Sequence, residues 1–291
     1  MTLKIRLLLI AVVCAFTAQN IMAQEYSGQA FAEADPSAAI ERPVIGSYRI
    51  ELGRRIDYSS YLSPFSYRGT NFALSGFWTK ALPCNPRHLA MHFEGRVNFG
   101  NLLNPAQTAR ELDFHAQLQW GLQWQKRLPD HWLLGVGGNV GLYGGALYLP
   151  RNGNNPVTAQ FAVGVGANAY ASRLIRIKKL PILIADRLTL PLLGGFFCQD
   201  YGEPYYEIYL GNHRGLAHFG WPGNRFGIDN LLSVTLDLGR TAMEVGYRFS
   251  MQNEHANHLT TRIFNHAFVI GVIPGGLGIK TGRKNIVTPL Y

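Results

Sequence analysis

Charged side chains that could do chemistry alternate with apolar ones in two segments of the chain. In residues 88–99 the apolar positions are Leu89, Met91, Phe93, Val97 and Phe99. The polar positions between them are His88, His92, Glu94, Arg96 and Asn98. Residues 111–125 repeat the pattern, with Glu111, Asp113 and His115 on the polar side. A side-chain period of two predicts strands with one apolar face and one charged face.

Seven of these polar-face side chains, from several strands, are expected to point into the interior of a barrel: Glu94, Arg96, Glu111, Asp113, His115, Glu244 and Arg248. The favoured interpretation is a lattice of ion pairs that satisfies buried polar groups. The alternative is a pathway or binding site for an anionic solute, which Arg96 and Arg248 would attract.

Metal, cofactor and catalytic chemistry find little support. His88 and His92 lie ~13 Å apart along a strand, so one ion cannot bridge them. Glu254, His255 and His258 could approach one another in a loop, although a solvated polar loop explains them equally well. The glycines between Gly135 and Gly141 fail as a dinucleotide motif, because Val140 replaces the third glycine and no crossover helix follows. We expect no metal, no cofactor and no catalytic group that spacing alone can identify.

The elements that must position these side chains are long strands, and strands of ~10 residues or more with an aromatic rim suit a bilayer. About twelve strands are expected between residues 46 and 273, forming an all-β, antiparallel, up-and-down transmembrane barrel. They lie near 47–53, 70–80, 88–100, 110–126, 132–148, 159–175, 184–197, 204–211, 214–221, 230–238, 241–253 and 259–273. The membrane-interface aromatics would be Trp78, Trp120, Trp124 and Trp132.

The predicted turns on the periplasmic side are all short: 82–87, 127–131, 177–181, 211–215 and 239–240. Cys84 and Cys198 fall at opposite ends of the barrel, too far apart for a disulfide.

Five glycines would line the inner face of two neighbouring strands: Gly135, Gly137, Gly141, Gly164 and Gly166. They leave room for a ligand or, as we favour, let the wall bend. Arg173, Arg176, Lys178, Lys179 and Arg187 cluster near one turn, where lipid head groups account for them.

The flanking segments predict export. Lys4 and Arg6 precede an apolar run, and Ala23 suits a cleavage site, so residues 1–23 are expected to be a signal peptide. Cys14 raises the alternative of a lipoprotein, but Val13 does not suit a lipidation motif. Residues 24–45 would form a flexible periplasmic leader and residues 274–291 a basic tail. After the signal, no run of eighteen apolar residues predicts a spanning helix.

Composition supports this assignment. Charged residues make up 15% of the chain and hydrophobic residues 47%, with 32 glycines, which suits strands whose outer face meets lipid. Loss of Lys4 and Arg6 with the signal lowers the net charge from +9 to +7. An exported basic chain favours outer-membrane lipid, lipopolysaccharide or an anionic solute as partners, with the barrel-insertion machinery, and argues against nucleic acid.

Three stretches resemble a family. They are residues 61–70 (YLSPFSYRGT), residues 191–208 (from PLLGGFF to YGEPYYEI) and residues 239–271 (from GRTA through GYR to HAFVIG). The chain resembles an uncharacterised Bacteroidetes-type outer-membrane β-barrel family, classed as a domain of unknown function. The resemblance implies the fold and an outer-membrane location, and it carries no catalytic residues. The tail after Pro274 departs from the family's usual ending on a strand aromatic.

Three functions stay open for such a barrel. The first is a narrow barrel that transports or binds a solute or anion. The second is a lipid-modifying enzyme, which would need a serine and a histidine within ~3 Å of each other. The third is a structural or assembly barrel with a plugged lumen. Twelve strands fall between barrels filled by side chains and barrels with an aqueous channel, so the lumen decides among them.

Overall fold

The computed structural model describes residues 40–178, 180–200, 208–211, 215–279 and 286–291. The predicted signal peptide, the first part of the predicted leader, Lys179 and the basic residues Lys280, Arg283 and Lys284 lie outside these ranges. The described residues from Ile40 to Tyr291 form one compact unit. Among them, no helix is long and apolar enough to cross a membrane.

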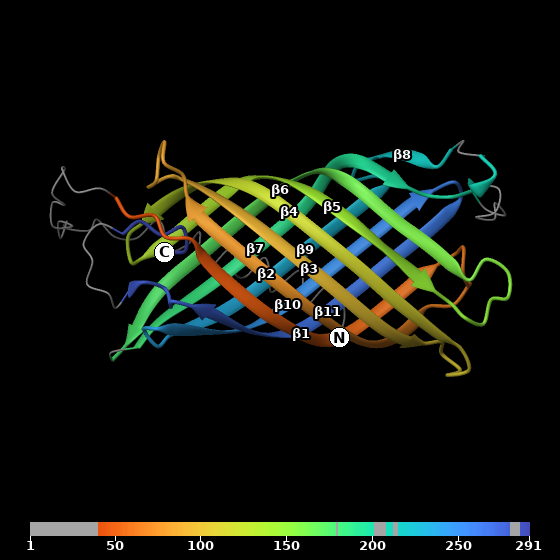
Figure 1. Cartoon of the computed structure of the whole chain (residues 1–291), viewed down its shortest axis with the longest axis horizontal. Helices are drawn as coiled ribbons and strands as arrows, with labels where there is room; N and C mark the ends of the chain where they lie inside the picture. The colour runs from red at the N-terminus through yellow and green to blue at the C-terminus, as the bar shows by residue number, and fades with distance from the viewer. Residues whose placement is uncertain (1–39, 179, 201–207, 212–214, 280–285) are drawn as a thin grey trace. The chain divides into compact units, whose positions relative to one another are not determined.

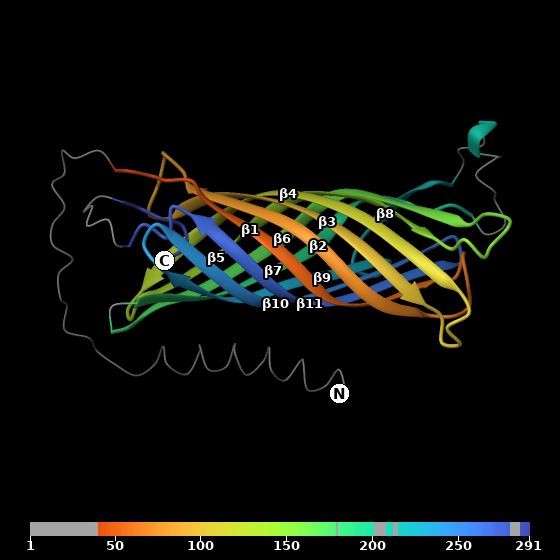
Figure 2. The same ribbon diagram turned by 60° about the horizontal axis from the view of Figure 1, so that its bottom comes forward.

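Eleven strands follow one another in the described chain. Their bounds are β1 Ile45–Ser59, β2 Tyr67–Ala81, β3 Leu89–Leu103, β4 Arg110–Leu128, β5 Trp132–Tyr148, β6 Val157–Ile177, β7 Leu180–Phe197, β8 Ala217–Gly220, β9 Arg225–Asp237, β10 Thr241–Ala256 and β11 Leu259–Pro274. Neighbouring strands pair antiparallel, β1 pairs with β11, and β6 also pairs with β7, so the sheet closes on itself. Figures 1 and 2 show the tilted strands that wind around this barrel.

The alternation in the sequence explains which side chains face the lumen. On β3, Glu94, Arg96 and Asn98 are buried, whereas Phe93 and Phe99 on either side of them are exposed. On β4, Glu111, Asp113 and His115 are buried. The exposed positions of β4 are Leu112, Phe114, Leu118, Trp120, Leu122 and Trp124. A barrel with an apolar outer face and a polar interior is the arrangement of transmembrane β-barrels.

The prediction of twelve strands is wrong, because ten long strands form the wall in the described residues. Part of the expected strand 204–211 lies outside the described ranges, and residues 208–211 are not extended. The expected strands 214–221 and 230–238 share one place in the wall, since β8 and β9 both pair with β7. A turn at residues 221–224 separates them, and Pro222 in that turn has no N–H for a ladder.

The barrel has two unlike ends. We call the terminal end the one where β1 begins and β11 stops, which also carries the turns after β2, β4, β6 and β9. The opposite loop end carries the longer connections, above all residues 198–216 between β7 and β8. Residues 211 and 215 therefore lie in the connection at the loop end and not in one of the short turns of the terminal end, and residues 208–211 of the expected strand are not extended.

Candidate functional site

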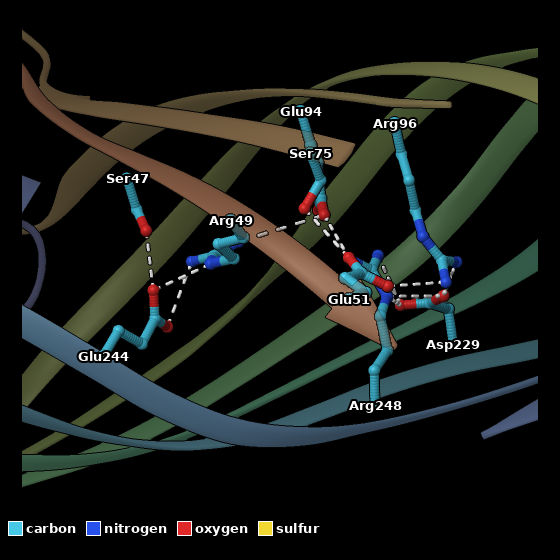
Figure 3. A network of polar contacts seen from close by, with 9 residues as sticks. All are labelled: Ser47, Arg49, Glu51, Ser75, Glu94, Arg96, Asp229, Glu244 and Arg248. Atoms are coloured by element: carbon cyan, nitrogen blue, oxygen red, sulfur yellow. Dashed lines mark hydrogen bonds and ion pairs between the residues drawn. The ribbon is translucent and has the colours of Figure 1, made fainter. Parts of the chain in front are cut away.

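A network of ion pairs crosses the middle of the lumen (Figure 3). We call it the central lattice, and it consists of Arg49, Glu51, Glu94, Arg96, Asp229, Glu244 and Arg248. Arg248 of β10 is its hub: its guanidinium contacts Asp229 of β9 at 2.8 Å, Glu94 of β3 at 2.7 Å and Glu51 of β1 at 3.1 Å. One side chain thus ties together four strands from opposite sides of the wall.

Two further arginines complete the central lattice. Arg49 donates from Nε to Glu244 at 2.7 Å, and Ser47 donates to the same carboxylate at 2.6 Å. Arg96 contacts Glu51 at 2.7 Å. Three arginines thus face four carboxylates, so the positive charge of Arg96 and Arg248 is balanced inside the protein.

A second group, the loop-side cluster, lies nearer the loop end and consists of Arg55, Asp57, Glu111, Asp113 and His115. Arg55 contacts Asp57 at 2.9 Å and Asp113 at 2.8 Å. His115 lies against Asp113 and contacts Gln160 of β6 at 2.8 Å. Glu111 is 1% exposed, and its Oε1 has no hydrogen-bond partner. This cluster is richer in acids than the central lattice.

The structure divides the seven predicted lumen residues between these two groups. Glu94, Arg96, Glu244 and Arg248 belong to the central lattice, whereas Glu111, Asp113 and His115 belong to the loop-side cluster. Sequence reasoning missed the inward residues of β1 and β9: Arg49, Glu51, Arg55, Asp57 and Asp229. The alternation of β1, where Tyr48, Ile50 and Leu52 are exposed, was the signal that could have identified four of them.

The predicted interface tryptophans do not form one ring. Trp78 packs against Tyr48 and Phe93 near the terminal end, and Trp132 at the start of β5 stacks with Arg173. Trp120 and Trp124 are exposed on the outer face of β4, with Trp120 nearer the middle of that strand. Arg187 departs from the predicted turn cluster, because it points inward and its guanidinium lies 3.5 Å from the ring centre of Phe77.

The C-terminal tail occupies the terminal mouth of the lumen. Gln125 and Arg127 of β4 donate to the carbonyls of Pro289 and Thr288, and Ser172 of β6 donates to the carbonyl of Leu290 at 2.7 Å. Leu290 belongs to an apolar cluster of inward side chains: Ile45, Leu133, Tyr170, Leu174, Leu183, Ala185, Ala242, Ile273 and Leu277. The terminal end of the barrel is therefore closed by the chain itself.

Tyr291 anchors the last residue. Burial, reinforced by the negative charge of Asp237, raises the pKa of Tyr291 to about 12. The phenol is thus protonated at neutral pH, and it donates to the carbonyl of Leu277 at 3.0 Å. A separate apolar cluster lies at the loop end on the side of β2 to β5, formed by Leu62, Tyr67, Leu102, Ala109, Leu147 and Leu149.

A cavity of about 120 Å³ remains beside Arg96, on the side of the wall formed by β5, β6, β7 and β9. It adjoins a break in the wall, because β7 pairs with β9 as far as Thr189 and with β8 from Gly194 onward. Pro191 lies in this break, and its ring packs so tightly on Gly227 that a Cβ there would lie 2.8 Å from Cγ of Pro191. The cavity thus borders the part of the wall where β7 and β9 are not paired.

Three polar side chains at this cavity have buried atoms without a hydrogen-bond partner. They are Nε of Arg96, Oδ1 of Asn98 and Oδ1 of Asn139. Leaving such atoms unpaired costs about 1–3 kcal/mol each, and buried polar groups are normally paired with protein, ordered water or a ligand. These three residues line the cavity, so its wall includes polar side chains whose hydrogen-bonding capacity is not fully used by the described protein.

Comparison with known proteins places the chain in a family. Residues 5–280 match the family described as "Protein of unknown function (DUF3316)". The chain belongs to the DUF3316 family. This confirms the predicted membership of a family of unknown function, and the Bacteroidetes origin stays a prediction. No curated protein matches the chain.

Solved structures similar to this DUF3316 chain are outer-membrane barrels. The outer-membrane protease OmpT from Escherichia coli is 9% identical over 79% of this chain and 96% of its own, with a TM-score of 0.43. The transport unit of the autotransporter AIDA-I from Escherichia coli is 6% identical over 87% of this chain and 93% of its own, with a TM-score of 0.41. The β domain of the Bordetella autotransporter BrkA is 10% identical over 79% of this chain and 99% of its own, with a TM-score of 0.38.

These values limit the likeness to a general barrel architecture. The location of the DUF3316 chain follows from its own structure, because a closed antiparallel barrel with an apolar outer face and a polar interior is the arrangement that suits a bilayer. The protein is a bacterial outer-membrane β-barrel.

Proposed function

We propose that this protein is a closed, non-conducting barrel that binds a small neutral polar solute in the cavity beside Arg96. The polar lining of the cavity, where Arg96, Asn98 and Asn139 keep unused hydrogen-bonding capacity, carries this proposal. A hydroxyl group both donates and accepts hydrogen bonds, so a polyhydroxylated molecule suits a lining that combines guanidinium and amide donors with amide acceptors. A space of 120 Å³ exceeds the minimum for one water about tenfold, which suits a guest the size of a monosaccharide.

The closed lumen favours binding over conduction. The tail and its apolar cluster occupy the terminal end, the central lattice crosses the middle, and a second apolar cluster narrows the loop end on the side of β2 to β5. An anion pathway along Arg96 and Arg248 would need a net positive lumen, and carboxylates balance both arginines. A structural role with a plugged lumen is the second candidate, and the tail seated in the terminal mouth favours it.

Two measurements on the purified full-length protein test this proposal. Heat modifiability first shows that the barrel is folded. Planar-bilayer recording of this folded protein is then expected to show no discrete openings. Thermal unfolding against a panel of monosaccharides and polyols is expected to show a concentration-dependent rise in Tm for one class, because a ligand that binds the native state stabilises it.

Variants localise the binding. Asn139→Leu is expected to abolish the solute-dependent rise in Tm, whereas Asn265→Leu, at another buried asparagine that does not line the cavity, is expected to retain it. Discrete anion-selective openings would refute the closed barrel. A silent barrel with no solute-dependent shift would refute binding and leave the structural role.

A further inference from the structure

Four arginines lie on the outward face of the barrel near the loop end. We call them the outer arginine patch: Arg54 of β1, Arg68 of β2, Arg110 of β4 and Arg262 of β11. All four are exposed. On β1, the exposed apolar run of Tyr48, Ile50 and Leu52 gives way to Arg54 at the next outward position. Ile56 and Tyr58 follow Arg54 on the same outward face, so the patch sets charge among the last apolar residues of the belt, toward the lipid head groups at the loop end.

The strand register brings three of these arginines close together. Arg68 and Arg110 both lie opposite Leu103 of β3, one on each side. Their Cα atoms are therefore about 10 Å apart, which is twice the distance between neighbouring strands. Arg54 lies opposite Thr70, so it is a diagonal neighbour of Arg68, at about 7–8 Å. Three long cationic side chains can converge on one group at this spacing.

No described carboxylate balances the patch. Every acidic residue of the strands around it is buried in the lumen: Glu51, Asp57, Glu94, Glu111, Asp113, Glu244 and Glu254. The connections 60–66 and 104–109 contain no acidic residue. Arg262 donates to Asn253 at 3.2 Å, which leaves its charge uncompensated. The carboxylates of these strands face the lumen, whereas the four arginines face outward. The outer arginine patch therefore needs an anion from outside the protein to balance its charge.

The loop end also indicates which leaflet supplies that anion. Barrels of this class have short periplasmic turns and longer extracellular connections, and the longer connections of this chain lie at the loop end. We propose that the outer arginine patch binds the phosphate groups of lipid A in the outer leaflet. The planar guanidinium donates two parallel hydrogen bonds to a phosphate, which makes arginine suited to this contact. The site is independent of the cavity beside Arg96.

The test compares two triple variants of the full-length protein in detergent. Arg54→Gln, Arg68→Gln and Arg110→Gln together remove the core of the patch. Lys80→Gln, Lys126→Gln and Arg173→Gln together remove three outward cations near the terminal end, with the same change in net charge. Native mass spectrometry then counts bound bisphosphorylated lipid A, with dephosphorylated lipid A and phosphatidylglycerol as comparison probes.

The patch variant is expected to lose at least tenfold in lipid A occupancy, whereas the terminal-end variant retains it. The wild-type protein is expected to prefer bisphosphorylated lipid A over both comparison probes. Equal loss in the two variants would show attraction by net charge, and equal binding of phosphatidylglycerol would show a site for any lipid phosphate; either result overturns the proposal. Both variants are expected to fold, because all six side chains face outward. Heat modifiability of each variant checks this.

Discussion

The wall of this barrel has two sectors that treat the lumen differently. Strands β1, β3 and β4 present long charged side chains to the interior, such as Arg49, Glu94 and Asp113. Strands β5 and β6 present glycines at many lumen positions: Gly135, Gly137, Gly141, Gly145, Gly164 and Gly166. Side chains from β1, β3 and β4 occupy the space beside the glycines of β5 and β6. The cavity lies where these side chains do not reach the glycines.

Individual glycines show this division of space. A Cβ at Gly145 would lie 2.4 Å from the ring of His115, and one at Gly135 would lie 2.7 Å from the side chain of Gln123. These glycines therefore make room for large neighbours on β4. A Cβ at Gly141 would meet nothing nearer than 3.8 Å, because Gly141 lines the cavity. Glycine in a barrel wall thus serves packing at some positions and leaves a hollow at others.

Breaking the charged sector is expected to have the largest effect. Arg248→Met removes the hub of the central lattice and leaves Glu51, Glu94 and Asp229 without their shared partner. Removing one partner of a buried ion pair costs about 3–5 kcal/mol, so we expect a large drop in the urea midpoint or failure to fold, measured by heat modifiability and tryptophan fluorescence. Arg54→Met is the control and should stay within about 0.5 kcal/mol of wild type. A small effect at Arg248 would mean that the lattice does not hold the two sides of the barrel together.

The glycine sector offers a sharper comparison within one strand. At Gly137 a Cβ would lie 1.9 Å from the backbone oxygen of Leu122, so Gly137→Ala forces the β4–β5 ladder apart. We expect it to lower the free energy of unfolding by about 1–3 kcal/mol. Gly141→Ala is expected to be neutral or slightly stabilising, since it enters open space. Urea unfolding of the two variants measures the difference, and equal costs would contradict the assignment of Gly141 to a cavity.

The smallest effect is expected where the tail joins the two sectors. Ser172→Ala removes a hydrogen bond from β6 to Leu290, at about 1 kcal/mol. We expect the tail to leave its site more often, so that carboxypeptidase removes C-terminal residues several-fold faster, as followed by mass spectrometry. Ser233→Ala, at another buried lumen serine, is the control. Unchanged digestion would show that the hydrogen bond from Ser172 is not needed to hold the tail, since Tyr170 and the contacts of β4 remain.

Sequence reasoning recovered the repeating part of the fold and missed its exceptions. Strands β3 and β4 alternate without a break, so their inward Glu94, Arg96, Asp113 and His115 could be placed from the period alone. The count failed at residues 204–238, where one wall position is shared by β8 and β9, because a broken strand has the same local pattern as two strands. Local patterns carry no information on which strand pairs with which.

The site depended on contacts across the lumen, and these could not be predicted. Arg248 meets Glu94 only because β3 and β10 lie opposite each other in a ten-stranded wall, 154 residues apart in sequence. The tail was expected to be a basic extension, whereas residues 288–291 pack into the terminal mouth. The apolar residues Pro289 and Leu290 were the signal that the end of the tail packs into the barrel. The nearby lysines and arginines led instead to the prediction of a basic extension.

The seated tail also implies an order of assembly. Its partners Gln125, Tyr170 and Ser172 come from strands that must already stand in their final places before they can offer a common binding surface. Residues 289 and 290 therefore dock after β4 and β6 have taken their places, and they act as a latch between these strands. An affinity tag fused after Tyr291 is therefore expected to weaken this latch.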